Sequence, residues 1–194
     1  MLSIFAKKAK ISSLLTCKSL KLQPHYHLNG YNPSSTHQPL TGQVAIVTGS
    51  GRGIGRAIAQ ALAQQGAAVT VTARSGEQLA DTVAGIAAAG GHALAVPAEV
   101  TDYDAVARVV AMTEQQFGPV DLLVNNAGTL GPIGPFWDVV PAEWWRAVGT
   151  HVYGMVQYSR AVLPGMVARR RGRIITVVNR STEPFPYAVT YGIK

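Results

Sequence analysis

The sequence predicts a single α/β domain built on a parallel, doubly wound β-sheet. From Gln43 onward, short apolar runs rich in β-branched residues alternate with amphipathic helical patterns. The same stretch is rich in Ala, Val and Gly, which is typical of buried parallel strands and closely packed helices. The chain has 194 residues, of which 47% are hydrophobic, so it can form one domain with a buried core.

Five strands and four helices follow one another along the chain. The strands are expected at 44–49, 67–73, 92–100, 120–128 with its exit turn, and 172–179. The helices are expected at 53–66, from Ser75 to the glycine pair 90–91, at 102–117 and at 141–169. Ser75 and Asp102 are expected to cap two of these helices. This alternation predicts βαβ units with right-handed crossovers.

The positive charge of the chain belongs to its N-terminal segment. The net charge is +7, and residues 1–40 contain five lysines and no acidic residue, which leaves twelve basic and ten acidic residues in 41–194. We expect 1–40 to be a disordered basic leader and linker, followed by the domain at 41–194. A nucleic-acid partner is not expected, because no aromatic residues are interleaved with these lysines.

The composition of residues 1–40 also indicates in which cellular compartment the protein is expected. This basic, acid-free composition is typical of an organelle transit peptide, and an unstructured extension is the alternative. We therefore expect a cytoplasmic protein or, through the leader, one of the mitochondrial matrix. The single cysteine, Cys17, excludes a disulfide within the chain and disfavours a zinc site, so no metal is expected. No apolar run approaches the roughly 20 residues of a membrane span.

A glycine-rich turn follows the first predicted strand. Its glycines let the backbone turn sharply and approach a pyrophosphate, and the helix behind it offers free N–H groups and a positive dipole end. A glycine-rich turn alone is weak evidence, but its place between a strand and an amphipathic helix makes it far more specific. The candidate cofactor-binding residues here are Thr48, Gly49, Ser50, Arg52, Gly53, Ile54 and Gly55.

The end of the second strand predicts which dinucleotide is bound. NAD(H) sites place an Asp or Glu about 20 residues after the turn, where it binds the ribose 2′-hydroxyl. Here the strand ends without an acid, and Arg74 lies at that distance. A guanidinium can pair with a 2′-phosphate, and Arg52 can supply a second cation. We therefore expect NADP(H) rather than NAD(H); two solvated surface arginines are the alternative.

Two motifs together resemble the short-chain dehydrogenase/reductase family. They are Thr48-Gly49-x-x-x-Gly53-x-Gly55 and, after the fourth strand, Asn125-Asn126-Ala127-Gly128. The resemblance covers about residues 41–194. It implies a Rossmann-type domain in which the second motif braces the sheet beside the cofactor, and it places Glu99-Val100 where an Asp normally touches the adenine. It also implies hydride transfer between nicotinamide and an alcohol or carbonyl substrate.

The catalytic positions depart from the pattern that the resemblance implies. That pattern has a Tyr with a Lys four residues later, a Ser on the preceding strand and an Asn in the long helix. Here Tyr191 and Lys194 are one residue too close, Asn179 takes the Ser position, and His151 takes the Asn position. His151 can serve a proton relay or can be an ordinary helix residue facing solvent.

These departures predict little or no dehydrogenase activity for the chain as given. The domain is expected to be C-terminally truncated, without the last helix and strand elements and without the segment that covers the substrate. Two explanations stay open: a fragment of a longer protein, or a degenerate copy that binds nucleotide without turnover.

The 141–169 helix carries two further features. Trp144 and Trp145 are adjacent, so at most one points at the core, and the other can cover a neighbouring copy in a homo-oligomer. The arginines at 169–171 and Arg173 follow the C-terminal end of this helix. Cations complement the dipole there, and we favour that interpretation over nucleic-acid binding.

Overall fold

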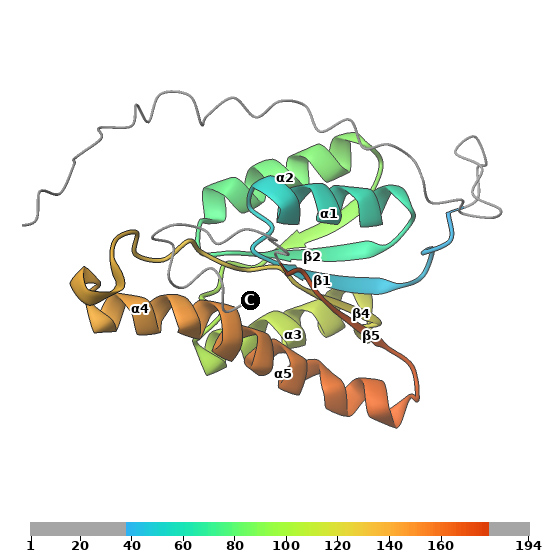
Figure 1. Ribbon diagram of the computed structural model, residues 1–194. Coiled ribbons are helices and arrows are strands. Elements are labelled where there is room, and N and C mark those ends of the chain that lie inside the picture. Colours follow the sequence, from blue (N-terminus) through green and yellow to red (C-terminus); the bar gives the residue numbers. More distant parts are fainter. Residues whose placement is uncertain (1–37, 179–194) are drawn as a thin grey trace, which may run out of the picture. The chain divides into compact units, whose positions relative to one another are not determined.

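The computed structural model describes residues 38–178, which contain a five-stranded parallel sheet (Figure 1). The strand order is β3-β2-β1-β4-β5. The strands are β1 (Val44–Thr48), β2 (Ala68–Thr72), β3 (His92–Ala95), β4 (Leu122–Asn125) and β5 (Arg173–Thr176). Because the order reverses beside β1, the carboxyl ends of β1 and β4 border the crevice where ligands bind in open α/β sheets.

Helices cover both faces of this sheet. In Figure 1, α1 (Gly53–Gln64) and α2 (Gly76–Ala88) lie on one side, and α3 (Tyr103–Phe117) and α5 (Gly154–Ala168) lie on the other. A short 3₁₀ turn, η2 (Phe136–Asp138), precedes α4 (Pro141–Val148), and the π-helical turn η3 (Gly149–Tyr153) joins α4 to α5. The predicted doubly wound α/β fold of Rossmann type is confirmed.

Alternate residues of β1 belong to opposite hydrophobic layers. Ala45 and Val47 pack with α1 and α2, in the layer that holds Leu79. Ile46 packs with α3 and α5, in the layer that holds Val109. Every residue of β1 is buried, which explains why the strand reads as one continuous apolar run.

Two predicted caps are confirmed. The Ser75 hydroxyl accepts a hydrogen bond from the Gln78 N–H at 3.3 Å, and the Asp102 carboxylate accepts one from the Ala105 N–H at 3.0 Å. Each cap satisfies one of the N–H groups that the first turn of a helix leaves without an intrahelical partner. The starts of α2 and α3 are therefore set by local sequence.

The third and fifth strands are shorter than predicted. The expectation for the third was 92–100, but the ladder ends at Ala95, two residues before Pro97, which has no N–H to donate. Isolated hydrogen bonds continue the pairing, from the Val96 N–H to Val71 O and from the Ala98 N–H to Ala73 O. The fifth strand, predicted at 172–179, spans Arg173–Thr176.

The long helix begins at Pro141, as predicted, but it is not one regular α-helix. The π-helical turn η3 interrupts it at Gly149–Tyr153. Single π-helical turns are rare in proteins, and many of those that occur lie at functional sites. Trp144 is half-buried and Trp145 is exposed, in agreement with the expectation that at most one points at the core.

The arginines after α5 make specific contacts as well as following the helix end. The Arg169 guanidinium donates to the Val120 carbonyl at 2.8 Å, and Arg171 lies 3.2 Å from the Asp121 carboxylate. Asp121 also accepts a hydrogen bond from the Val44 N–H. These contacts join the end of α5 to the start of β4 and β1. Across residues 38–178, none of the helices combines the length and apolar character needed to cross a bilayer.

Candidate functional site

The first turn of the candidate site joins β1 to α1 and is closely packed. A side chain at Gly55 would collide with the Gly49 carbonyl and the Asn126 amide, so only glycine fits there. Gly53 has φ +55°, and the space beside it is open. The turn is thus tightly held on its inner side and free to receive a ligand at Gly53.

Arg56 on α1 stabilises this turn through hydrogen bonds to its backbone. This residue was not singled out in the sequence analysis. Its guanidinium donates to the Gly51 carbonyl, at 3.1 Å from Nε and 2.5 Å from Nη2, and reaches the Gln78 carbonyl on α2 at 3.3 Å. Asp81 lies 3.8 Å away. A cation in the first turn of a helix is unfavourable to the dipole, and that was the available signal of a specific role.

The second motif is hydrogen-bonded to the first. The Thr48 hydroxyl accepts the backbone N–H groups of Asn126 and Ala127, both at 3.0 Å. The Asn126 side chain donates to the Thr48 carbonyl at 2.9 Å and to the Gly49 carbonyl at 3.3 Å. The two turns, about 78 residues apart in sequence, therefore form one rigid unit.

Ser50 stabilises this unit from within through hydrogen bonds to two strands. Its side chain is fully buried, its hydroxyl donates to the Val47 carbonyl at 2.8 Å, and it accepts the Thr72 N–H at 2.9 Å. The Ser50 hydroxyl thus joins β1 to β2, and a direct contact with a ligand is left to its neighbours in the turn.

The start of α1 fits an anionic group of a dinucleotide. The first N–H groups of any helix lack intrahelical partners and form its positive dipole end. Arg52 occupies the N-cap position, and its side chain cannot accept a hydrogen bond from these groups as a capping residue would. The open space at Gly53 gives a diphosphate room to approach them.

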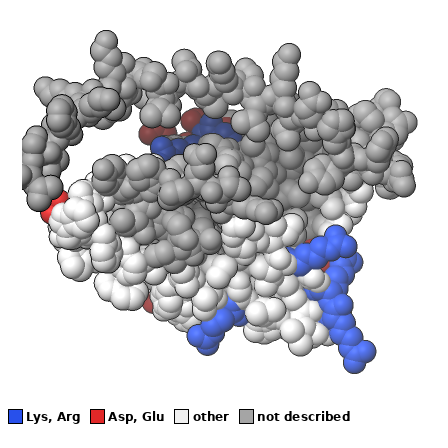
Figure 2. All heavy atoms as spheres, in the orientation of Figure 1, with Lys and Arg blue, Asp and Glu red and all other residues white. Residues whose placement is uncertain are grey.

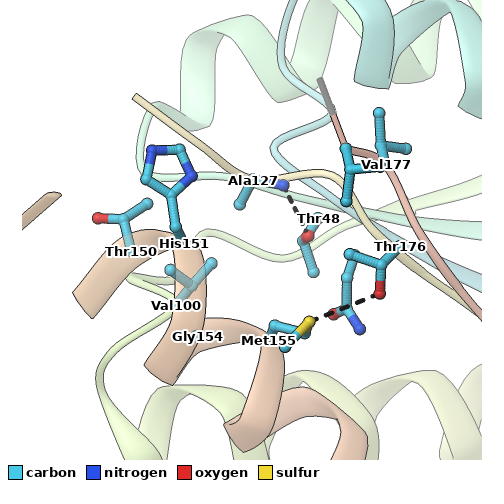
Figure 3. Close-up of a pocket in the computed structure, with 11 residues that line it drawn as sticks. Thr48, Val100, Ala127, Thr150, His151, Gly154, Met155, Thr176 and Val177 are labelled. Atoms are coloured by element: carbon cyan, nitrogen blue, oxygen red, sulfur yellow. Dashed lines mark hydrogen bonds between the residues drawn. The ribbon is translucent and has the colours of Figure 1, made fainter. Parts of the chain in front are cut away.

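A cavity of about 200 Å³ lies between the ends of the strands and the π-helical turn (Figure 3). Five of the candidate residues line it, from four different segments of the chain: Thr48, Val100, Asn125, Ala127 and His151. Gly154, Met155 and Thr176 complete much of the wall. The Asn125 side-chain oxygen is buried without a hydrogen-bond partner among residues 38–178, so an acceptor is available at the cavity wall.

His151 lies on the wall of this cavity. Its side chain is only 7% exposed, so the alternative of a solvent-facing helix residue is wrong. Its Nε2 lies 2.6 Å from the Thr129 carbonyl oxygen, and the Thr129 N–H lies 3.4 Å from the same nitrogen. His151 therefore holds the segment that follows the Asn-Asn-Ala-Gly turn against the π-helical turn.

Arg74 and Glu99 meet beyond the carboxyl ends of β2 and β3. The Arg74 Nε lies 3.8 Å from a Glu99 carboxylate oxygen. The Arg74 side chain is 80% exposed, which leaves it free to reach a bound anion. The structure thus brings together two candidates that the sequence analysis treated separately.

Three candidate catalytic residues, Asn179, Tyr191 and Lys194, lie outside the described residues. The structure places His151 but not its expected catalytic partners. Within the part of the chain that is described, no cluster of three or more His, Cys, Asp or Glu side chains could hold a metal ion.

Comparisons with known proteins agree with this geometry. The family model described as short chain dehydrogenase matches residues 43–192. A short chain dehydrogenase of Pseudocercospora fijiensis is 37% identical over 163 residues, which cover 82% of this chain and 52% of the relative. The chain thus spans about half the length of that curated relative.

Two solved structures resemble the fold closely. A metagenomic short-chain oxidoreductase in complex with NADP is 38% identical, with a TM-score of 0.73 over 79% of this chain and 72% of that one. An NAD⁺-bound xylitol dehydrogenase is 30% identical, with a TM-score of 0.76 over 80% of this chain and 60% of that one. Both nicotinamide cofactors therefore occur among the structural neighbours.

Proposed function

The chain belongs to the short-chain dehydrogenase/reductase family of oxidoreductases, and we propose that it carries an NADP(H) site for hydride transfer to or from an alcohol or carbonyl substrate. One observation carries the proposal: the glycine-rich turn, the Asn-Asn-Ala-Gly turn and a cavity all meet at the carboxyl ends of β1 and β4. This is where open α/β sheets bind dinucleotides.

The preference for NADP(H) rests on Arg74. The neighbours include an NADP complex and an NAD⁺ complex, so the fold alone does not choose. At the end of β2 this chain has an exposed guanidinium in the place where NAD sites have the acid that binds the ribose 2′-hydroxyl. A charge-assisted contact from Arg74 to a 2′-phosphate favours the phosphorylated cofactor.

The remaining roles follow from family membership. The glycine-rich turn and Arg74 would hold NADP(H), and the bound cofactor would supply the hydride chemistry. Tyr191 exchanges the proton with the substrate oxygen, and the Lys194 ammonium favours the ionised form of that Tyr. Asn179 orients the substrate carbonyl in place of the expected Ser. His151 lies on the cavity wall and takes part in proton relay.

The decisive experiment measures nucleotide binding first and turnover second. Fluorescence titration should show that the chain binds NADPH more tightly than NADH. NADPH oxidation against ketones, aldehydes and quinones should be slow, because Tyr191 and Lys194 are one residue too close. Tyr191→Phe should lower the remaining rate by less than the roughly 10²–10⁴ that a well-positioned acid/base contributes. Equal binding of both cofactors, or no binding, would refute the proposal.

The N-terminal 40 residues are proposed to be separable from the domain. The compact unit that contains the site begins at His37, close to the expected boundary at residue 41. A chain that starts at residue 41 should keep its NADPH affinity. A fusion of residues 1–40 to a fluorescent protein would distinguish a mitochondrial signal from a cytoplasmic leader.

A homo-oligomer through 141–169 is also proposed. Six large apolar side chains on α4, η3 and α5 are exposed: Trp145, Val152, Tyr153, Val156, Leu163 and Val167. Within α5, Val156, Leu163 and Val167 follow one another at seven and four residues, so they lie along one side of that helix. In Figure 2, much of the lower described surface is uncharged, with basic side chains at its lower edge and, at the lower right, near the end of α5. Val156→Lys should shift the sedimentation coefficient toward that of a monomer.

A further inference from the structure

We propose that Glu99 competes with the 2′-phosphate of the cofactor for Arg74. This competition limits the preference of the site for adenosine nucleotides that carry a 2′-phosphate over those that lack it. The inference rests on the proposed NADP(H) site and deepens it. It makes Glu99 a specificity-determining residue that acts through its neighbour.

Parallel strand pairing explains why these two residues meet although 25 positions separate them. The regular ladder between β2 and β3 pairs Val71 with Ala95. Beyond it, the Ala98 N–H still donates to the Ala73 carbonyl at 3.0 Å. The two segments therefore leave the sheet side by side, and the next residue of each is Arg74 or Glu99. Their contact is fixed by the backbone as well as by the side chains.

The contact is strong enough to matter and weak enough to be replaced. The Arg74 Nε and a Glu99 carboxylate oxygen are 3.8 Å apart, beyond ideal hydrogen-bonding distance. The side chains are 80% and 40% exposed, and such ion pairs contribute little free energy. A phosphate monoester carries a charge of about −1.5 to −2 near neutral pH, so it can draw the guanidinium away from a single carboxylate.

The length of Glu99 is the feature that creates the competition. An Asp at this position would carry the same charge on a shorter side chain. Removal of one methylene group would retract the carboxylate by about 1.5 Å, one carbon–carbon bond, from a contact that is already 3.8 Å long. An Asp would therefore release Arg74 while it keeps the negative charge in the same region.

The test compares two nucleotides that differ only in the 2′-phosphate. Isothermal calorimetry on the full chain should give dissociation constants for 2′,5′-ADP and 5′-AMP, and their ratio measures recognition of the 2′-phosphate. Glu99→Gln should raise the preference for 2′,5′-ADP about threefold, the effect expected for an exposed ion pair. Glu99→Asp should raise it similarly. Glu114→Gln, which removes the same charge from an exposed site on α3, should leave it unchanged.

A second background isolates the route through Arg74. In the Arg74→Ala chain, Glu99→Gln should no longer change the preference, because no guanidinium remains to be shared. An equal increase in that background would show direct repulsion of the phosphate and would overturn the proposal. So would an unchanged or reduced preference in Glu99→Gln, since a reduced one would mean that Glu99 positions Arg74 for the phosphate.

Failure of the inference and failure of the proposed function give different results. If neither nucleotide binds the unmutated chain, the NADP(H) site itself is refuted, and the inference falls with it. If both bind and the Glu99 variants keep the original ratio, only the inference is refuted. Circular dichroism of each variant confirms that these exposed substitutions leave the fold intact.

Discussion

Thr48 accepts two hydrogen bonds from Asn126, one at its hydroxyl and one at its carbonyl. The Thr48 hydroxyl accepts the Asn126 backbone N–H at 3.0 Å, and the Asn126 side-chain amide donates to the Thr48 carbonyl at 2.9 Å. Thr48 ends β1, and Asn126 directly follows β4. The exit turns of two neighbouring strands are thereby fixed relative to each other, and the proposed nucleotide site is built on them.

Thr48→Val should therefore destabilise the domain. Val keeps the shape but removes the acceptor of two N–H groups, and an unsatisfied buried donor costs about 1–3 kcal/mol. Urea denaturation measures the loss. Thr48→Ser keeps the hydroxyl and should retain most of the stability; equal losses in the two variants would show that the methyl group, and not the hydrogen bonds, is important.

Gly55→Ala should disrupt the glycine-rich turn. The new side chain would meet the Gly49 carbonyl and the Asn126 amide, and forced overpacking costs about 1–3 kcal/mol. We expect a lower melting temperature together with weaker NADPH binding by fluorescence. Gly76→Ala is the matched control, because its side chain would meet only Pro97 at an ordinary 3.6 Å. An undisturbed Gly55→Ala protein would contradict the close packing of the turn.

Arg74→Asp should remove much of the preference for NADPH over NADH. It removes the cation proposed for the 2′-phosphate and introduces the acid that binds a ribose 2′-hydroxyl in NAD sites. The preference for NADPH over NADH should fall by about 1–3 kcal/mol, the range of a charge-assisted contact. Fluorescence titration with both cofactors measures it. Arg170→Asp, in the exposed turn after α5, makes the same charge change and should have no such effect.

His151→Leu should loosen the segment after the Asn-Asn-Ala-Gly turn. Leu cannot bond to the Thr129 carbonyl, which the imidazole Nε2 approaches to 2.6 Å. Hydrogen exchange of the amides around Thr129 should accelerate, because local opening no longer breaks that contact. His151→Gln retains a donor and should show a smaller effect. Unchanged exchange in the Leu variant would mean that the packing of η3 alone holds this segment.

Ionisation of Tyr158 should lower the stability of the domain at alkaline pH. Burial raises the pKa of its phenol to about 12, whereas an unfolded Tyr has a pKa of about 10. The folded state therefore keeps this proton longer, so stability is unaffected below pH 10 and falls as the pH rises from about 10 to 12. The loss should reach about 2–3 kcal/mol.

The control for this prediction is Tyr158→Phe. It removes the ionising group together with a 3.4 Å contact to the Thr72 hydroxyl. The difference in unfolding free energy between the unmutated chain and this variant cancels the ionisations that both share. That difference should be constant up to about pH 10 and then decline. A difference independent of pH would show that Tyr158 ionises in the folded state as it does in water.

The sequence by itself determined the fold class, the caps and the glycine-rich turn. Each depends on residues close together in the chain: β-branched runs next to helical periodicity, Ser75 three residues before Gln78, and glycines between a strand and a helix. Such patterns act through local backbone geometry, so they can be read without knowing what lies opposite. The start of the long helix at Pro141 is also set locally, because proline is favoured at the first position of a helix.

Only the tertiary structure decided which distant residues meet. The Arg74–Glu99 pair depends on the register of β2 against β3, and the inward direction of His151 depends on a π-helical turn that shifts the helix phase after α4. Arg56 finds its acceptors on the turn and on α2, where no periodicity indicates them. Strand register and helix phase are set by packing across the whole sheet, because a contact between distant segments exists only once both are in place.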